Sequence, residues 1–300
     1  MPLPNFLIIG SAKSGTTALF KYLEQHPEVF ISEPKEPHFL ALEGQPLRFK
    51  GPGDDQMMNT KAITDFEKYK SLFDRAGNAK AIGEGSVSTL YYKESIARIQ
   101  KYIPNAKLIA LLRHPADRAW SAFSFMHARV FEPIQDFRLA LDSEQRRIDD
   151  GWHHIWHYKH QGLYYEQLRH YFEAFDRSQI KVYLYDDFRK SPSQVLQNCF
   201  QFVGVDDKFV PKETPSPHAS GMPRSKLLQV LVTRTKSIRK ALKLFTPSSF
   251  RKKLNRKFEE LNLQKDKLDP KIRMELIDYF RSDITKLQGL IQRDLSGWLC

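Results

Sequence analysis

The sequence predicts an α/β fold in which helices flank a central parallel sheet in three layers. Short apolar runs alternate with amphipathic segments along the chain, the pattern of strands joined by helical crossovers. Two runs, Lys107–Leu112 and Ile180–Tyr185, are apolar almost throughout, as expected of strands covered on both faces. A length of 300 residues and 41% hydrophobic content suit one domain spanning residues 1–300.

The elements follow from local patterns. Strands are predicted at Phe6–Ile9, Val29–Ile31, Ala81–Ile82, Lys107–Leu112 and Ile180–Tyr185. Apolar residues three or four positions apart predict helices at Thr16–Gln25, Ile63–Phe73, Glu94–Tyr102, Ala116–Arg129, Ile134–Ile148, Tyr164–Phe175 and Ser193–Val203, with a last one between Ile272 and Ile291. Ligands of such folds bind beyond the carboxyl ends of the strands. The Gly- and Pro-containing segment Glu43–Asn59 is predicted as a surface loop near that edge.

The net charge of +12 lies in one segment. Twelve Lys and Arg residues and no acid lie between Arg224 and Lys257, which leaves 35 cations and 35 acids elsewhere. A chain otherwise balanced in charge is not expected to bind nucleic acid. A solvated face, an anionic acceptor and peripheral contact with an acidic membrane remain open for residues 224–257.

The ends of the chain and its cysteines bear on its location. Cys199 and Cys300 cannot form a disulfide framework, which favours a reducing compartment. The first nine residues lack a basic segment followed by a long apolar one, so no signal peptide is expected. We therefore expect a cytoplasmic protein. The sequence contains no signal for its oligomeric state.

A candidate anion-binding loop follows the first strand. The chain there reads Lys13-Ser14-Gly15-Thr16-Thr17 and enters a helix. Backbone N–H groups at a helix start bind phosphate, to which Lys13 adds a positive charge and the Ser and Thr side chains add hydroxyl donors. The loop is not a Walker A motif, in which Gly directly precedes Lys.

A second candidate anion site follows the strand Lys107–Leu112. Arg113 stands at the strand end, and Ser121 lies about two helical turns further on. Pairing of Arg113 with Asp117 is the alternative. An Arg at this position binds an anion, whereas a nucleotide kinase carries an Asp there for Mg²⁺. Two anion sites at strand ends indicate a ligand with phosphates at two separate positions.

These motifs resemble those of the sulfotransferases that use 3′-phosphoadenosine 5′-phosphosulfate (PAPS). Lys13 to Thr17 resembles that family's 5′-phosphosulfate loop, and Arg113 to Ser121 resembles its 3′-phosphate motif. Lys35-Glu36-Pro37-His38-Phe39-Leu40 resembles the acid-containing motif of the heparan-sulfate-type carbohydrate sulfotransferases and their bacterial relatives. Weaker matches occur at residues 83–86, 162–164, 185–188 and 294–298. The resemblance implies a P-loop-like three-layer fold and metal-free transfer of a sulfuryl group from PAPS to a hydroxyl or amine.

The resemblance also implies roles for particular residues. Lys13 would neutralise charge on the leaving phosphate, and Glu36 would act as the base that accepts the acceptor's proton. A carboxylate in that role is expected to have a pKa raised by burial. His38 would orient Glu36 or contact the acceptor. Glu84 is the alternative base, or else a structural carboxylate that accepts hydrogen bonds from loop amides.

Two further expectations follow from the family. Gly85 stands where the heparan-sulfate enzymes commonly carry a Lys. The turn that contains Gly221 and Arg224 occupies the place of a loop that closes over the nucleotide in related enzymes. Gly221 and Arg224 are therefore assigned to the 3′-phosphate or the adenine.

We expect the acceptor to be a glycan, a lipid or a small metabolite, and its predicted binding segments are residues 41–60 and 127–160. The His-rich stretch Trp152–His160 is interpreted as an aromatic acceptor wall, a packed surface helix or, least favoured, a metal site. Two other functions remain as alternatives: a P-loop nucleotide kinase or ATPase, and a non-enzymatic protein that binds anions or membranes.

Overall fold

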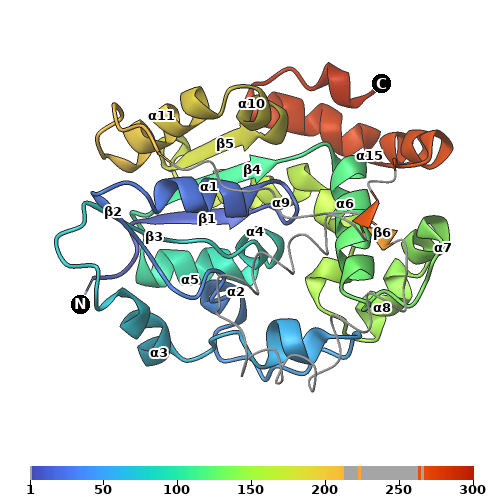
Figure 1. Cartoon of the computed structure of the whole chain (residues 1–300), viewed down its shortest axis with the longest axis horizontal. Helices are drawn as coiled ribbons and strands as arrows, with labels where there is room; N and C mark the ends of the chain where they lie inside the picture. The colour runs from blue at the N-terminus through green and yellow to red at the C-terminus, as the bar shows by residue number, and fades with distance from the viewer. Residues whose placement is uncertain (1, 213–221, 224–262, 265–266) are drawn as a thin grey trace, which may run out of the picture.

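The computed structural model describes residues 2–212, 222–223, 263–264 and 267–300. Gly221, Arg224 and the basic segment 224–257 lie outside the described residues. The central sheet is parallel and has the strand order β2-β3-β1-β4-β5 (Figure 1). Its strands are β1 (Phe6–Gly10), β2 (Val29–Ile31), β3 (Ala81–Glu84), β4 (Lys107–Leu112) and β5 (Ile180–Leu184). The predicted sheet is confirmed.

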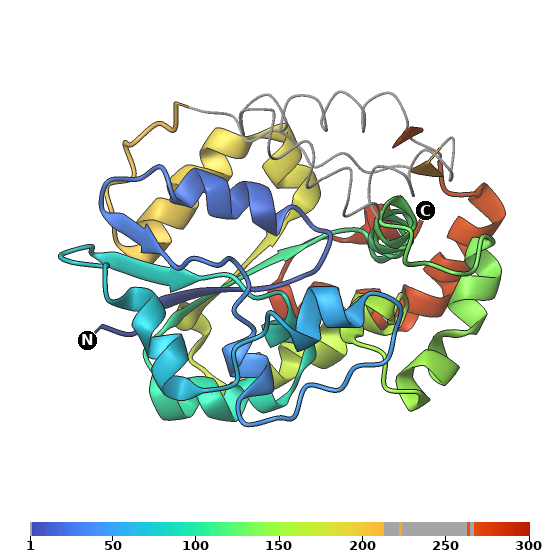
Figure 2. The same cartoon turned by 60° about the horizontal axis from the view of Figure 1, so that its bottom comes forward.

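Helices cover both faces of the sheet, because side chains in each strand alternate in direction. Phe6 and Ile8 of β1 pack with α1 (Thr16–Leu23) and α11 (Pro192–Val203) on one face. Leu7 and Ile9 pack with the cluster of the other face. That face is covered by α4 (Ser88–Tyr91), α5 (Glu94–Tyr102), α6 (Pro115–Ala128), α9 (Tyr164–Ala174) and α15 (Pro270–Ile291). The three-layer prediction is confirmed (Figure 2).

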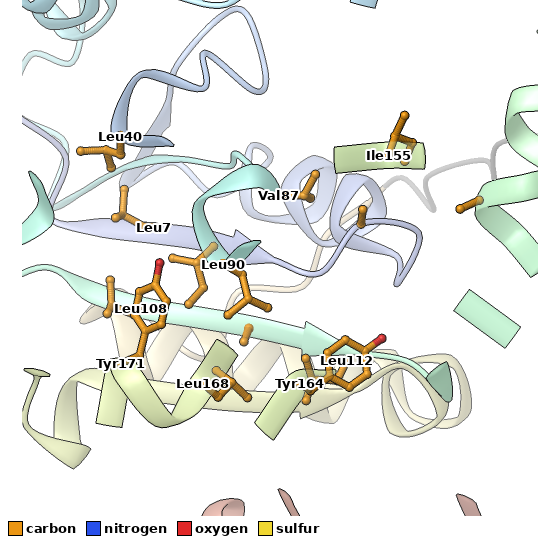
Figure 3. Close-up of a cluster of buried hydrophobic side chains, with 14 of the residues drawn as sticks. Leu7, Leu40, Val87, Leu90, Leu108, Leu112, Ile155, Tyr164, Leu168 and Tyr171 are labelled. Carbon is orange, nitrogen blue, oxygen red and sulfur yellow. The ribbon is translucent and has the colours of Figure 1, made fainter. Parts of the chain in front are cut away.

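The larger core cluster joins β1 and β4 to α9. Figure 3 shows Leu108 and Leu112 facing Leu168 and Tyr171, and in this view Leu90 stands between β1 and β4. These side chains are all at most 2% exposed. Such burial stabilises the fold by about 1.5–3 kcal/mol for each large apolar side chain, which keeps the strand ends rigid.

Several elements differ from the prediction. The continuous helix predicted at Ile134–Ile148 is wrong: α7 (Phe137–Asp142) begins where Asp136 accepts a hydrogen bond from the N–H of Leu139, and α8 (Glu144–Asp149) follows. Similarly, α3 (Phe66–Lys70) begins at its cap Asp65 and is followed by η2 (Ser71–Phe73). Tyr185 does not extend β5 but starts α10 (Tyr185–Lys190).

The remaining elements are short. They are α2 (Phe39–Leu42), η1 (Asp55–Asn59), η3 (His154–Trp156), η4 (His160–Gly162), η5 (Arg177–Gln179), η6 (Ser296–Trp298) and the antiparallel pair β6 (Met222–Pro223) and β7 (Leu263–Gln264). β6 lies beside α6 (Figure 1). Within the described residues, no helix combines the length and the apolar character needed to cross a membrane.

Candidate active site

Four strand ends meet at one edge of the sheet. β1 pairs with β3 and β4, and β2 pairs with β3, all in parallel. The loops that carry Lys13 and Arg113 therefore leave neighbouring strands, while Glu84 ends β3 and Glu36 follows β2. The structure brings these predicted site residues to the same edge of the sheet.

The loop after β1 begins in close contact with α4. A Cβ atom at Gly10 would lie 2.7 Å from Leu90, so the strand end approaches α4 closely. Gly15 has a φ of +93°, a conformation that favours glycine. It caps α1 without a side-chain hydrogen bond, so the first N–H groups of the helix, at Thr16 and Thr17, remain available to an anion. The Ser14 hydroxyl instead bonds Ser11 at 2.6 Å inside the fold.

Lys13 lies among cations and one aromatic ring. Its ammonium is 3.9 Å from the centre of the Phe125 ring, and the Arg129 guanidinium is 3.7 Å from the same centre. Burial lowers the pKa of Lys13 to about 7, and the charges of Arg129 and Arg113 act in the same direction. The positive charges around Lys13 repel one another. A bound anion reduces this repulsion, so the site attracts an anion.

Arg113 is placed to bind an anion. Its guanidinium lies 5.0 Å from the centre of the Tyr185 ring and donates a hydrogen bond of 3.3 Å to the Lys13 carbonyl. The suggested pairing with Asp117 is wrong, because Asp117 pairs with Arg273. In the described part of the chain, Arg113 has no carboxylate partner. Ser121 lies on α6, the helix that begins directly after His114.

Glu36 is held by its neighbours on the same loop. Its Oε1 lies 2.5 Å from the Lys35 ammonium, and its Oε2 lies 3.8 Å from His38 Nε2. Burial raises the pKa of Glu36, but Lys35 and His38 lower it by more, and the net pKa is below its usual value. The expected upward shift is therefore wrong for Glu36. The side chain is ionised at neutral pH, the state that a proton acceptor needs.

Glu84 has the raised pKa instead. Its side chain is buried, and burial raises its pKa to about 7 against the opposing effect of a hydrogen bond from Ser86. The Ser86 hydroxyl donates to Oε2 at 2.7 Å, while Oε1 has no partner among the described residues. The expectation that loop amides satisfy this carboxylate is wrong. Glu84 lies behind the loop of Glu36, and the Ser86 hydroxyl also accepts a hydrogen bond from the His38 N–H at 3.0 Å.

The His-rich stretch is a buried wall rather than a surface helix. It forms the short turns η3 and η4, and His153, His154 and His157 are all buried. Burial lowers the pKa of His153 and His154 well below the usual value, which makes both neutral at pH 7. The His154 ring stacks on Tyr91 and lies 6.3 Å from the His38 ring. The stretch therefore adjoins the loop that carries Glu36 and His38, as the acceptor-wall interpretation requires.

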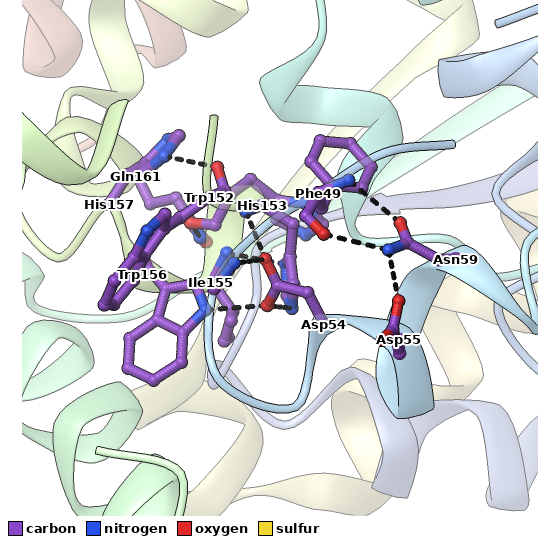
Figure 4. Close-up of polar contacts among 12 residues, drawn as sticks. Phe49, Asp54, Asp55, Asn59, Trp152, His153, Ile155, Trp156, His157 and Gln161 are labelled. Carbon is purple, nitrogen blue, oxygen red and sulfur yellow. Dashed lines mark hydrogen bonds and ion pairs between the residues drawn. The ribbon is translucent and has the colours of Figure 1, made fainter. Parts of the chain in front are cut away.

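Asp54 fastens the segment 41–60 to this wall (Figure 4). Its carboxylate accepts hydrogen bonds from the N–H groups of Gly51 at 2.8 Å and His153 at 3.0 Å, and from Trp156 Nε1 at 2.8 Å. Asp54 is fully buried, and η1 follows it. The predicted surface loop is therefore partly wrong, because this acid anchors it inside the protein.

Replacing Asp54 with asparagine should lower the free energy of unfolding by about 1–3 kcal/mol, since the amide offers one acceptor oxygen and turns an NH₂ group toward a donor. The adjacent exposed residue supplies the control: Asp55→Asn should change that free energy by less than about 0.5 kcal/mol. Urea unfolding of both variants measures the difference. Equal stabilities would contradict the anchoring role of Asp54.

Two residues beside Lys13, Phe125 and Arg129, were not predicted from the sequence. Phe125 follows Ser121 by four residues on α6, and Arg129, four residues further on, caps the C-terminus of that helix, so the spacing favours one face. This spacing was the available signal, but only the fold shows that Lys13 faces them. Within the described residues, no group of three or more His, Cys, Asp or Glu side chains could hold a metal ion.

Comparisons with known proteins identify the family of the chain. The model of the sulfotransferase family matches residues 4–209, more than half of the chain. The crystal structure of a sulfotransferase from Alicyclobacillus acidocaldarius aligns with 99% of this chain and 99% of its own, at 34% identity and a TM-score of 0.79.

Two mammalian relatives match a shorter stretch. Human carbohydrate sulfotransferase 15 is 25% identical over 246 residues, which cover 68% of this chain and 44% of the relative. Mouse bifunctional heparan sulfate N-deacetylase/N-sulfotransferase 4 is 25% identical over 222 residues, which cover 69% and 23%. The chain thus spans less than half the length of these relatives. The family match and the bacterial structure, which aligns with nearly the whole chain, show that the chain is an enzyme and belongs to the sulfotransferase family.

Proposed function

We propose that this enzyme transfers a sulfuryl group from PAPS to a hydroxyl or amine of a glycan, a lipid or a small metabolite. Transfer from PAPS is the general reaction of the family. The observation that carries the proposal is the pair of cations at neighbouring strand ends, Lys13 and Arg113, beside the uncapped start of α1.

The described residues suit such a ligand. Lys13 and the N–H groups from Ser14 to Thr17 would hold the 5′-phosphosulfate, and Arg113 with Ser121 would hold the 3′-phosphate. Gly221 and Arg224, which lie outside the described residues, are proposed for the 3′-phosphate or the adenine on the family resemblance alone. When bound, PAPS supplies a sulfuryl group attached to a phosphate leaving group.

The side chains of the loops supply the remaining chemistry. Glu36, ionised at neutral pH, accepts the proton that the acceptor hydroxyl or amine loses. Lys13 stabilises negative charge on the leaving oxygen, and the fixed N–H groups of α1 add to this effect. We propose that these steps need no metal.

Aromatic rings line the space beside the loop that carries Glu36 and His38, and they indicate the class of acceptor. Tyr91, Tyr92 and His154 present rings next to His38, and aromatic faces suit sugars and other partly apolar acceptors. The relatives named above are described as acting on carbohydrate and heparan sulfate. A screen of cell extracts for label transferred from [³⁵S]PAPS identifies the acceptor.

A thermal-shift titration tests the proposal against its alternatives. Adenosine 3′,5′-bisphosphate (PAP) in the presence of EDTA should raise the melting temperature. At concentrations well above its Kd, binding to the folded protein should add about 2–4 kcal/mol to the free energy of unfolding. Stabilisation by ATP only with Mg²⁺ would instead indicate a kinase or ATPase. Stabilisation only by RNA or acidic vesicles would indicate a non-enzymatic binder.

A further inference from the structure

The imidazole of His38 has a polar side chain near each of its two nitrogens. Its Nδ1 lies 2.8 Å from Ser88 Oγ, and its Nε2 faces Glu36 Oε2 at 3.8 Å. The backbone of His38 has a φ of 60° and is tied separately, since its N–H donates to Ser86 Oγ at 3.0 Å. Ser86 of the β3–α4 connection therefore holds His38 through its backbone, and Ser88, the first residue of α4, holds it through its ring.

The surroundings of His38 keep its ring uncharged, so the ring has one of two tautomers. Burial lowers its pKa, Lys35 and Lys61 act in the same direction, and Glu36 opposes them. The ring is accordingly neutral at pH 7 and carries one proton. His154 is the aromatic neighbour across the site, and its own lowered pKa keeps it uncharged. One nitrogen of His38 donates and the other accepts.

The Ser88 hydroxyl decides which nitrogen holds the proton. Ser88 is fully buried, and in the described part of the chain its Oγ has one hydrogen-bond partner, His38 Nδ1. A buried hydroxyl proton without an acceptor is costly, so Ser88 donates to Nδ1. Nδ1 then carries no proton, and Nε2 carries it toward Glu36. Ser86 cannot be the residue that donates to Nδ1, because its hydroxyl proton is donated to Glu84.

We propose that Ser88 is a positioning residue that selects the Nε2–H tautomer of His38, so that the ring donates toward Glu36 and keeps its carboxylate in the proton-accepting form. The catalytic consequence rests on the proposed function, in which Glu36 is the base. Ser88 itself touches neither the donor nor the acceptor; it acts through His38.

The tautomer can be measured without a substrate. Imidazole ¹⁵N–¹H NMR spectra of the full chain, with the His38 signals assigned by their loss in His38→Asn, should show protonated Nε2 and unprotonated Nδ1. Ser88→Ala should give a mixture of tautomers, and Ser88→Thr should restore the wild-type pattern. The matched control is Thr89→Val on the same helix, because the buried Thr89 hydroxyl has no partner to lose.

Kinetics supply the second measurement. Ser88→Ala should lower kcat about tenfold, less than loss of the base itself, with the KM for PAPS unchanged. Ser88→Thr and Thr89→Val should retain kcat. A wild-type spectrum with protonated Nδ1, or an unchanged tautomer in Ser88→Ala, overturns the proposal. Absence of any transfer from PAPS by the wild-type enzyme would instead overturn the proposed function, while the tautomer result would still stand.

Discussion

Replacing Glu36 with glutamine is expected to lower the rate of sulfuryl transfer by about 10²- to 10⁴-fold, the usual contribution of a positioned acid or base. The amide has nearly the same shape as the carboxylate but cannot accept the acceptor's proton. PAP affinity should stay nearly unchanged, because Glu36 lies among cations and is not itself a phosphate ligand. Single-turnover transfer from [³⁵S]PAPS and calorimetric titration with PAP measure the two quantities.

Glu84→Gln is the matched control for that experiment. Its carboxylate has a pKa of about 7, closer to the value associated with a base, but it is buried behind the loop and bonded to Ser86. We expect Glu84→Gln to reduce transfer much less than Glu36→Gln. Full activity of Glu36→Gln together with loss in Glu84→Gln would move the base to Glu84.

Replacing Lys13 with methionine is expected to lower transfer by about 10²- to 10³-fold, the cost of removing one donor that stabilises transition-state charge. Methionine keeps most of the aliphatic chain that lies against Phe125 but loses the positive charge. PAP should also bind more weakly. Lys21→Met is the control, because Lys21 lies on α1 in an exposed pair with Glu24. Equal effects of the two substitutions would contradict the role of Lys13.

The pKa of Lys13 predicts a pH dependence of PAP binding. Only the protonated ammonium attracts phosphate, and its pKa in the free protein is about 7. A bound anion raises that pKa, so affinity is full below pH 7 and falls by up to about tenfold for each pH unit above it, until the pKa of the complex is passed. Calorimetry between pH 6 and 9 measures the slope. The slope should be absent in Lys13→Met, and a flat wild-type profile would contradict the prediction.

The parts predicted correctly from the sequence depend on local patterns. Continuous apolar runs identify the strands, and the inverted order of Lys13 and Gly15 distinguishes the loop from a Walker A motif. Parallel pairing then places every strand end at one edge, so the site follows from the elements alone. The family resemblance added Glu36 and His38, which no periodicity singles out.

The parts that could not be predicted depend on side-chain conformations and on contacts between segments that lie far apart in the sequence. The pKa of Glu36 is lowered because the Lys35 ammonium folds back onto it, which composition does not reveal. The His-rich stretch is buried because Asp54, about a hundred residues earlier, accepts its N–H groups. The short helices α2 and α4 span four residues each, too few for a helical period to be visible.

We propose that the enzyme transfers a sulfuryl group from PAPS without a metal and with Glu36 as the base. The most direct test adds [³⁵S]PAPS and EDTA to a desalted cell extract, with either wild-type enzyme or Glu36→Gln at equal concentration. We expect labelled products with the wild-type enzyme that are absent or greatly reduced with Glu36→Gln, although both proteins bind PAP. Wild-type protein that transfers no label, or label transferred equally by both proteins, would contradict it.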